Sequence, residues 1–299
     1  MLVLDLRQDT DNLSGRLRYK VSQFPDGQQS IDIIAQDPTD FYDVSKFFKD
    51  GVEIRSRMNS FKDVELIVCA NQALKNLGVK KIELYVPYFL GARSDRKFSI
   101  GSVNYIKDVI APIINLQGFD KVTVVDPHSD VLEACLQNFS KSGNIDLVRS
   151  SLQKYWMMTG QIISDMSKVV YVSPDAGALK KVYSVNDSFK SNQDVLVCSK
   201  YRDIDGKLSK TLVPLTDDVL DKDLFIVDDI CDGGGTFLNI AKAIKENENF
   251  TGKIYLIVSH GIFSRGFDDL KNSFEHIFTT NSISNEEVEN FVTRLDVFK

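Results

Sequence analysis

Residues 224–236 read Leu-Phe-Ile-Val-Asp-Asp-Ile-Cys-Asp-Gly-Gly-Gly-Thr, an apolar run followed by acidic residues and three consecutive glycines. The run 224–227 has the length and apolarity of a buried strand, and apolar residues recur at helical spacing over 237–244. The glycine-rich turn therefore joins a strand to a helix, which is the connection that decides the fold.

This turn has the chemistry of a sugar-phosphate site. Its backbone N–H groups and the following helix N-terminus attract an anion, and the Thr236 hydroxyl adds a donor. Asp228 and Asp229 can accept hydrogen bonds from two neighbouring sugar hydroxyls. The spacing matches neither the dinucleotide-binding nor the P-loop glycine pattern. An ordinary acidic strand-to-helix turn is the simpler alternative, but three adjacent glycines carry an entropy cost that such a turn does not need.

The rest of the chain predicts an α/β fold with mainly parallel sheets flanked by helices. Short apolar runs lie at 82–86, 122–125, 169–172, 195–197, 224–227 and 254–258, and helical patterns include 64–77 and 103–116. Polar motifs follow the strands, so they are expected to share the crevice at the strand carboxyl ends. Two strands that each end in an acid, at Asp126 and Asp228, indicate two related halves. The polar stretch 140–144 separates domains 1–144 and 145–299.

The composition limits the classes of protein to which the chain can belong. The chain has 299 residues, of which 43% are hydrophobic and 26% charged, as in ordinary globular domains. No apolar run approaches the roughly 20 residues that span a bilayer, so no membrane association is expected. A net charge of -6 argues against binding to nucleic acid. The four cysteines are widely spaced and are predicted to be reduced thiols, which favours a cytoplasmic location.

A second acidic motif follows the strand at 122–125. Asp126, His128 and Asp130 supply carboxylate oxygens and an imidazole, which suit magnesium held largely through water and substrate phosphates. In isolation the same residues favour a capping or turn role. His260 also follows a strand, but a structural role is favoured for it, and His276 lies in an apolar context typical of packing.

Two loops concentrate positive charge. Residues 87–97 contain Arg93, Arg96 and Lys97, and residues 199–210 contain four cations around an Asp-Gly turn. The second loop could close over a bound phosphate chain. Solvated surface turns are the simpler alternatives for both.

Together these segments resemble the ribose-phosphate diphosphokinases, also called phosphoribosyl pyrophosphate (PRPP) synthetases. The resemblance covers nearly the whole chain, in segments 24–27, 88–97, 126–128, 173–177, 200–202, 227–236 and 260–264. It implies two phosphoribosyltransferase-type domains in each subunit and assembly into homo-oligomers, either dimers or hexamers. It also implies Mg²⁺ as cofactor, and ATP and ribose 5-phosphate as substrates.

The resemblance assigns roles to matching residues of this chain. The catalytic residues it implies are Arg93, His128, Lys200 and Arg202. The ATP site it implies combines Phe24, Asp26 and Gln28 of a neighbouring subunit with Arg93, Ser94, Asp95, Arg96, Lys97 and His128. The metal ligands are Asp126, His128 and Asp175. The ribose-phosphate site is formed by Asp175, Asp228, Asp229, Asp232, Gly233, Gly234, Gly235 and Thr236.

The chain also departs from the family pattern. Gln28 replaces an acid and Ser94 replaces a glutamine, which affects the adenine contacts. Residues 98–104 lack the usual Arg and Pro residues, which puts phosphate activation and ADP inhibition in doubt. Gly233 and Gly234 replace bulkier residues, leaving room beyond the 5-phosphate.

Ribose 5-phosphate is the first choice of acceptor. Because of the room left at Gly233 and Gly234, ADP-ribose is the nearest alternative, with a product that feeds NAD synthesis as resembling enzymes of some bacteriophages do. A phosphoribosyltransferase that consumes PRPP and a non-catalytic regulatory subunit are the other two hypotheses. The first would need neither the Arg93 loop nor the Asp126 motif, and the second would need neither Lys200 nor Arg202.

Overall fold

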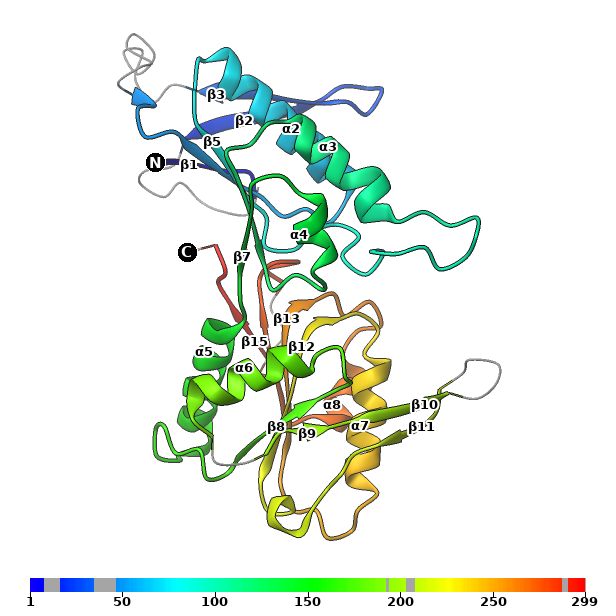
Figure 1. The fold of residues 1–299 in the computed structure, drawn as a ribbon. Helices are drawn as coiled ribbons and strands as arrows, with labels where there is room; N and C mark the ends of the chain where they lie inside the picture. The colour runs from blue at the N-terminus through cyan, green and yellow to red at the C-terminus, as the bar shows by residue number, and fades with distance from the viewer. Residues whose placement is uncertain (8–16, 35–46, 192–193, 203–207, 287–289, 299) are drawn as a thin grey trace. The chain divides into compact units, whose positions relative to one another are not determined.

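The computed structural model describes residues 1–7, 17–34, 47–191, 194–202, 208–286 and 290–298 (Figure 1). By internal contacts the chain forms two compact units, one of residues 1–142 with Phe298 and one of Gly143–Val297. The boundary expected between residues 144 and 145 lies two residues from this division. The polar stretch 140–144, which was expected to separate the domains, is in part a strand. Residues Phe139–Ser142 pair with the edge of the first sheet.

The N-terminal unit is built on a five-stranded parallel sheet. Its strands, in spatial order, are β1 (Leu2–Asp5), β4 (Val52–Arg55), β5 (Ile82–Tyr85), β6 (Lys121–Val125) and β7 (Phe139–Ser142). All four pairings are parallel, so the carboxyl ends of these strands meet at one edge. Strands β2 (Arg18–Gln23) and β3 (Gln29–Ile34) form a separate antiparallel hairpin.

Helices of the N-terminal unit are α2 (Phe61–Asn76), the π-helical turn η1 (Ile106–Ile110), α3 (Ala111–Leu116) and α4 (Val131–Cys135). Helix α2 begins at a capping box, in which the Ser60 side chain accepts from the Asp63 N–H and the Asp63 side chain accepts from the Ser60 N–H. Its buried residues Val64, Ile67, Ala70 and Leu74 recur at helical spacing and pack into the core of this unit.

The C-terminal unit contains a six-stranded sheet. Its spatial order is β15 (Val292–Leu295), β14 (His276–Thr280), β13 (Ile254–Gly261), β12 (Asp223–Cys231), β8 (Val169–Ser173) and β9 (Leu196–Val197). Every neighbouring pair is parallel. Strands β10 (Ser199–Arg202) and β11 (Leu208–Leu212) form an antiparallel hairpin outside this sheet.

Helices cover both faces of the second sheet (Figure 1). Helices α5 (Ile145–Thr159) and α6 (Leu179–Phe189) pack on the face that contains Phe225 and Val227. Helices α7 (Gly235–Lys245) and α8 (Asp268–Ser273) pack on the face that contains Leu224 and Ile226. A strand buried on both faces is apolar at every position, which explains the continuous run 224–227. The short 3₁₀ turn η2 (Asp217–Val219) precedes β12. Among the described residues, no helix has the length and apolarity to span a membrane.

Strand β12 is longer than the apolar run predicted. It continues through Asp228 and Asp229 to Cys231, because β13 also extends and pairs with it as far as Cys231 and Gly261. Pairing with β8 on the other side ends at Ile226. The two carboxylates therefore lie within a strand and not in the loop that follows it, on a segment that only β13 flanks.

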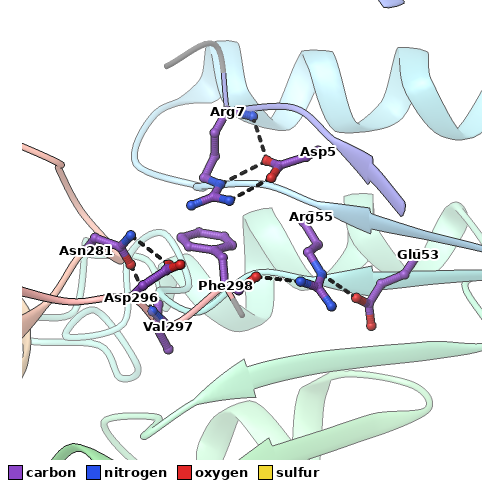
Figure 2. A network of polar contacts seen from close by, with 8 residues as sticks. All are labelled: Asp5, Arg7, Glu53, Arg55, Asn281, Asp296, Val297 and Phe298. Atoms are coloured by element: carbon purple, nitrogen blue, oxygen red, sulfur yellow. Dashed lines mark hydrogen bonds and ion pairs between the residues drawn. The ribbon is translucent and has the colours of Figure 1, made fainter. Parts of the chain in front are cut away.

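Phe298 belongs to the N-terminal unit and packs on a buried ion pair (Figure 2). The Arg7 guanidinium lies 3.9 Å from the Phe298 ring centroid and bonds both oxygens of Asp5, with Nη2 and Oδ2 separated by 2.6 Å. Arg55 donates to the Phe298 carbonyl oxygen. Both members of the Arg7–Asp5 pair are almost fully buried, so the ring of Phe298 shields paired charges from water.

Candidate functional site

The candidate sugar-phosphate site lies at the carboxyl ends of β8 and β12 in the C-terminal unit. Asp229 is buried and Asp228 is half-buried, and the Asp229 N–H donates to Asp228 Oδ1 over 2.9 Å. Lys181 Nζ, in the first turn of α6, lies 3.9 Å from Asp229 Oδ2. A cation therefore lies near one of these two adjacent carboxylates.

Burial raises the pKa of Asp228 well above its usual range, and the negative charges of Asp229 and Asp175 raise this pKa further. Because the charge of Asp175 contributes to the raised pKa of Asp228, Asp175, which follows β8, lies within electrostatic range of the pair. The structure thus brings together three of the predicted ribose-phosphate residues. Such carboxylates are stabilised by hydrogen-bond donors such as sugar hydroxyls, or by a cation that neutralises their charge.

Asp175 also holds the turn that starts helix α6. Its Oδ1 accepts hydrogen bonds from the N–H groups of Gly177 and Ala178 at 3.0 and 3.2 Å. Its backbone carbonyl accepts from the Ser173 hydroxyl at 2.8 Å. One carboxylate oxygen is thus fixed by the chain itself, as in an Asx turn.

The glycine-rich turn supplies N–H donors at the start of α7. Gly234 is the N-cap residue, has φ +76° and gives the helix no side-chain cap. A side chain there would be strained, and its Cβ would lie 3.1 Å from the Leu270 side chain. No described atom lies within 4 Å of a Cβ built on Gly235. The first N–H groups of a helix have no partner within the helix, so those of α7 are donors of the kind that can bind an anion.

The N-terminal unit carries the second candidate group, after β5 and β6. Asp126 is buried and has φ +40°, a conformation that costs a non-glycine residue on the order of 1–3 kcal/mol. Its N–H donates to the Ser142 carbonyl at 2.7 Å, and the Val125 N–H donates to the Pro87 carbonyl at 3.0 Å. These bonds tie the start of the Asp126 motif to the end of β7 and to the start of the basic loop.

Other residues of this group are more exposed. His128 and Asp130 are exposed, and Asp130 lies 3.6 Å from Lys141 Nζ on the surface. In the basic loop Arg93, Arg96 and Lys97 are exposed, and the Arg96 guanidinium lies 5.6 Å from the Phe98 ring centroid.

The backbone of the basic loop is fastened at two positions. The Ser94 carbonyl accepts from the Tyr105 N–H at 2.9 Å, and the Asp95 carbonyl accepts from the Asn104 side chain at 2.6 Å. Exposed cations on a fastened loop can meet a bound anion without a large rearrangement of the backbone.

Two of the segments singled out in the sequence lie in hairpins, β2–β3 and β10–β11. Phe24 is exposed at the tip of β2–β3, and the Asp26 side chain accepts from the Gln28 N–H within the turn. Lys200 and Arg202 lie in strand β10, but their side chains are outside the described part of the structure, as is the turn 203–207.

Magnesium ligands were predicted at Asp126, His128 and Asp175. Asp126 and His128 belong to the N-terminal unit and Asp175 to the C-terminal unit. Within the described residues, no group of three or more His, Cys, Asp or Glu side chains is arranged to hold a metal. Asp126 in the N-terminal unit and Asp175 in the C-terminal unit each carry carboxylate oxygens, the type of donor that a hard cation such as Mg²⁺ prefers.

Sequence reasoning missed two basic residues that lie beside the candidate sugar-phosphate residues. Lys181 lies beside Asp229, and Arg265 packs against Gly233. Both follow motifs that were recognised, at 173–177 and 260–264. A cation one turn into a helix that follows an acidic loop is the signal that could have identified Lys181.

The two buried histidines have structural partners. His260 Nδ1 lies 2.9 Å from the Ser282 hydroxyl. His276 Nε2 lies 2.8 Å from the Thr293 hydroxyl, and its ring packs on Phe278. Burial lowers the pKa of His276, which keeps this imidazole neutral. These contacts agree with the structural roles expected for both residues.

Comparison with known proteins shows that the sequence is similar to several enzymes named ribose-phosphate pyrophosphokinase. The ribose-phosphate pyrophosphokinase of Mycoplasmopsis pulmonis is 27% identical over 241 residues, which is 80% of this chain and 70% of the relative. Those of Ureaplasma parvum and Haemophilus influenzae are 29% and 27% identical over 67% of this chain, and cover 57% and 60% of their own lengths. The chain thus spans less than two thirds of these last two relatives. No protein-family model matches the chain.

A solved structure gives the same fold. Phosphoribosylpyrophosphate synthetase from Mycobacterium smegmatis aligns with a TM-score of 0.74 at 18% identity, covering 94% of this chain and 87% of the other. The present chain is therefore an α/β protein with two phosphoribosyltransferase-type domains. By sequence it is similar to ribose-phosphate pyrophosphokinases, at 27–29% identity over 67–80% of the chain. These relatives are enzymes by name, in agreement with the prediction of an enzyme.

Proposed function

We propose that this chain transfers the β,γ-diphosphate of ATP to the anomeric hydroxyl of ribose 5-phosphate, giving PRPP and AMP. One observation carries the proposal: β12, which holds the paired carboxylates Asp228 and Asp229 near its carboxyl end, leads within a few residues into a glycine turn whose N-cap residue Gly234 gives α7 no side-chain cap. Relatives named for ribose-phosphate pyrophosphokinase activity support it.

The acceptor would bind along the end of β12. The amides of 233–236 and the Thr236 hydroxyl would hold the 5-phosphate, while Asp228 and Asp229 accept from the ring hydroxyls. A pKa of Asp228 raised by burial and by its acidic neighbours means that the free site carries unfavourable charge. Hydroxyl donors would relieve it, so binding and correct orientation of the sugar are coupled.

The donor site would use residues of the N-terminal unit. Arg93, Ser94, Asp95, Arg96, Lys97 and His128 would contact ATP, with Phe24, Asp26 and Gln28 supplied by a neighbouring subunit. The exposed ring of Phe24 at a hairpin tip suits such a role in a homo-oligomer, either a dimer or a hexamer.

The reaction needs alignment and charge neutralisation. The anomeric oxygen attacks the β-phosphorus of ATP, the bond from this phosphorus to the bridging α,β-oxygen breaks, AMP leaves and the hydroxyl proton is released. Lys200, Arg202 and Arg93 would neutralise charge that develops on the transferred group. Magnesium, when bound, neutralises phosphate oxygens, and Asp126, His128 and Asp175 are the residues that would hold it. The four free thiols favour a cytoplasmic location for this chemistry.

The experiment incubates the protein with MgATP and ribose 5-phosphate and measures AMP release and product mass. We expect AMP in equal amounts with a product heavier than the acceptor by one diphosphate group. A parallel reaction with PRPP and each nucleobase tests the phosphoribosyltransferase alternative. If no acceptor, including ADP-ribose, yields AMP while the protein still binds ATP, a non-catalytic subunit replaces the proposal.

A further inference from the structure

Helix α6 covers the face of β12 on which Asp229 lies. Phe225, Val227 and Asp229 are alternate residues of this strand, and alternate residues of a strand lie on the same face. Phe225 and Val227 belong to the same buried core as Val182 of α6. The face that α6 covers therefore continues to Asp229, and the residue before Val182 in the helix is Lys181.

The acidic loop that precedes α6 fixes where the helix begins. Asp175 Oδ1 accepts hydrogen bonds from the N–H groups of Gly177 and Ala178. The Val182 N–H then donates to the Ala178 carbonyl at 3.1 Å, which closes the first turn of the helix. Lys181 lies in this turn, so the backbone of the loop determines where its side chain starts.

The Lys181 ammonium is a counter-charge for a buried carboxylate. Its Nζ lies 3.9 Å from Asp229 Oδ2, and the two side chains are 27% and 6% exposed. Burying a carboxylate is costly, and a nearby cation lowers this cost. The separation is longer than the roughly 3 Å of a hydrogen bond, so the ammonium attracts the carboxylate without donating to Oδ2. Lys181 therefore does not compete with a sugar hydroxyl for this oxygen.

This inference rests on the proposed function and concerns how the acceptor sugar is recognised. A carboxylate that accepts from ring hydroxyls binds more tightly when its orientation is fixed before the sugar arrives, because less entropy is then lost on binding. We propose that Lys181 is a positioning residue, which holds the Asp229 carboxylate in the orientation that accepts from the ring hydroxyls and does not itself touch the acceptor.

The test measures KM for ribose 5-phosphate, kcat and ATP affinity in Lys181→Ala and Lys181→Arg. Bonds from ring hydroxyls are already made when the sugar binds, so their loss raises KM and leaves kcat nearly unchanged. For a coupled pair of neighbours we expect KM to rise roughly tenfold in Lys181→Ala, with kcat within about threefold and ATP affinity unchanged. Lys181→Arg restores the charge and should return KM to within about threefold of the unmodified value. Lys180→Ala removes the exposed neighbouring cation of α6 and is the matched control, with all three quantities unchanged.

A double-mutant cycle with Asp229→Asn tests whether Lys181 acts through its partner. The amide keeps an acceptor oxygen and removes the buried charge, so in this background Lys181→Ala should change KM by less than about twofold. This comparison also serves if Lys181→Ala alone does not fold, because Asp229→Asn leaves no uncompensated charge at position 229.

A tenfold rise in KM that persists in the Asp229→Asn background would show that Lys181 contacts the acceptor directly, and would overturn the inference. An unchanged KM in a Lys181→Ala protein that is only less stable in urea would do the same, since it would leave a structural role alone. Both results leave the proposed function intact, because the unmodified protein still releases AMP. Absence of AMP from the unmodified protein would overturn the proposed function instead, and calorimetric titration with ribose 5-phosphate would then measure the effect of Lys181 without turnover.

Discussion

Asp228 and Asp229 are adjacent carboxylates on a segment of β12 that has no strand on its β8 side. Lys181 Nζ lies 3.9 Å from Asp229 Oδ2, and the raised pKa of Asp228 reflects burial and the charges of Asp229 and Asp175. The free protein therefore holds a destabilising arrangement at the place where a polyhydroxyl ligand would bind. Residues kept in this state are typical of binding and catalytic sites.

The first prediction concerns Asp228→Asn. A carboxyl whose pKa is raised on folding favours the folded state below its unfolded pKa of about 4, and this contribution is lost as pH rises through the folded pKa. The amide keeps the oxygen that accepts from the Asp229 N–H but removes the charge. At pH 7.5 the variant should be more stable than the unmodified protein by about 1 kcal/mol and should lose activity.

Urea unfolding at pH 7.5 and at pH 4 measures this difference. The gain should shrink at the lower pH, where Asp228 is protonated in the folded state and about half protonated in the unfolded state. A variant that is less stable at pH 7.5 would contradict the charge repulsion inferred at this pair.

At the scale of elements, the hairpin β10–β11 begins at the edge of the sugar-phosphate site. The Cys198 N–H, just before β10, donates to the Ser173 carbonyl at the end of β8, two residues before Asp175. The pairing of β10 with β11 shifts register between Tyr201 and Arg202. A two-stranded hairpin outside a larger sheet is only marginally stable, which suits a segment that closes over a ligand.

The second prediction is that Lys200→Ala and Arg202→Ala each lower kcat by roughly a hundredfold, the usual effect of removing one group that stabilises transition-state charge. ATP affinity should change little, because a closing loop acts mainly on the transition state. Steady-state kinetics and ATP titration measure the two effects separately. Lys168→Ala, which removes a surface ion pair with Asp221 before β8, is the control and should leave kcat unchanged. Unchanged kcat in both hairpin variants would contradict the role assigned to this element.

At the scale of the molecule, each unit has its own core. The N-terminal unit includes Phe298, whose ring covers the Arg7–Asp5 pair, and the C-terminal unit includes Trp156, which is buried in α5 and donates to the Asp165 carbonyl. Trp156 is the single tryptophan of the chain, so its fluorescence reports on the C-terminal unit.

The third prediction is that Phe298→Ala destabilises the N-terminal unit by about 3 kcal/mol, because a buried aromatic ring is lost and an ion pair is uncovered. Far-UV circular dichroism in urea should show an early transition, while the Trp156 fluorescence transition keeps its midpoint. Phe274→Ala, in the core of the C-terminal unit, should do the reverse and shift the fluorescence. If both variants shift both signals equally, the two units unfold as one.

The sequence by itself determined the fold class and indicated where the candidate site would lie. Apolar runs alternating with helical patterns indicate parallel strands, and three glycines after an acidic pair indicate an anion-binding turn. These features could be predicted because strand and helix periodicity and turn chemistry are local properties of consecutive residues. The family resemblance followed from motifs of the same kind, each only a few residues long.

Only the tertiary structure decided how far β12 extends, which cations lie at the site and what fills the space at Gly233. Asp228 is part of a strand because β13 continues beside it, and Lys181 lies about fifty residues before its partner Asp229 in the chain. Arg265 packs on Gly233 because the bonds from Ile262, Phe263 and Ser264 hold its loop against Cys231 and Asp232. Such contacts join residues distant in sequence, and they depend on packing geometry that no local pattern of residues encodes.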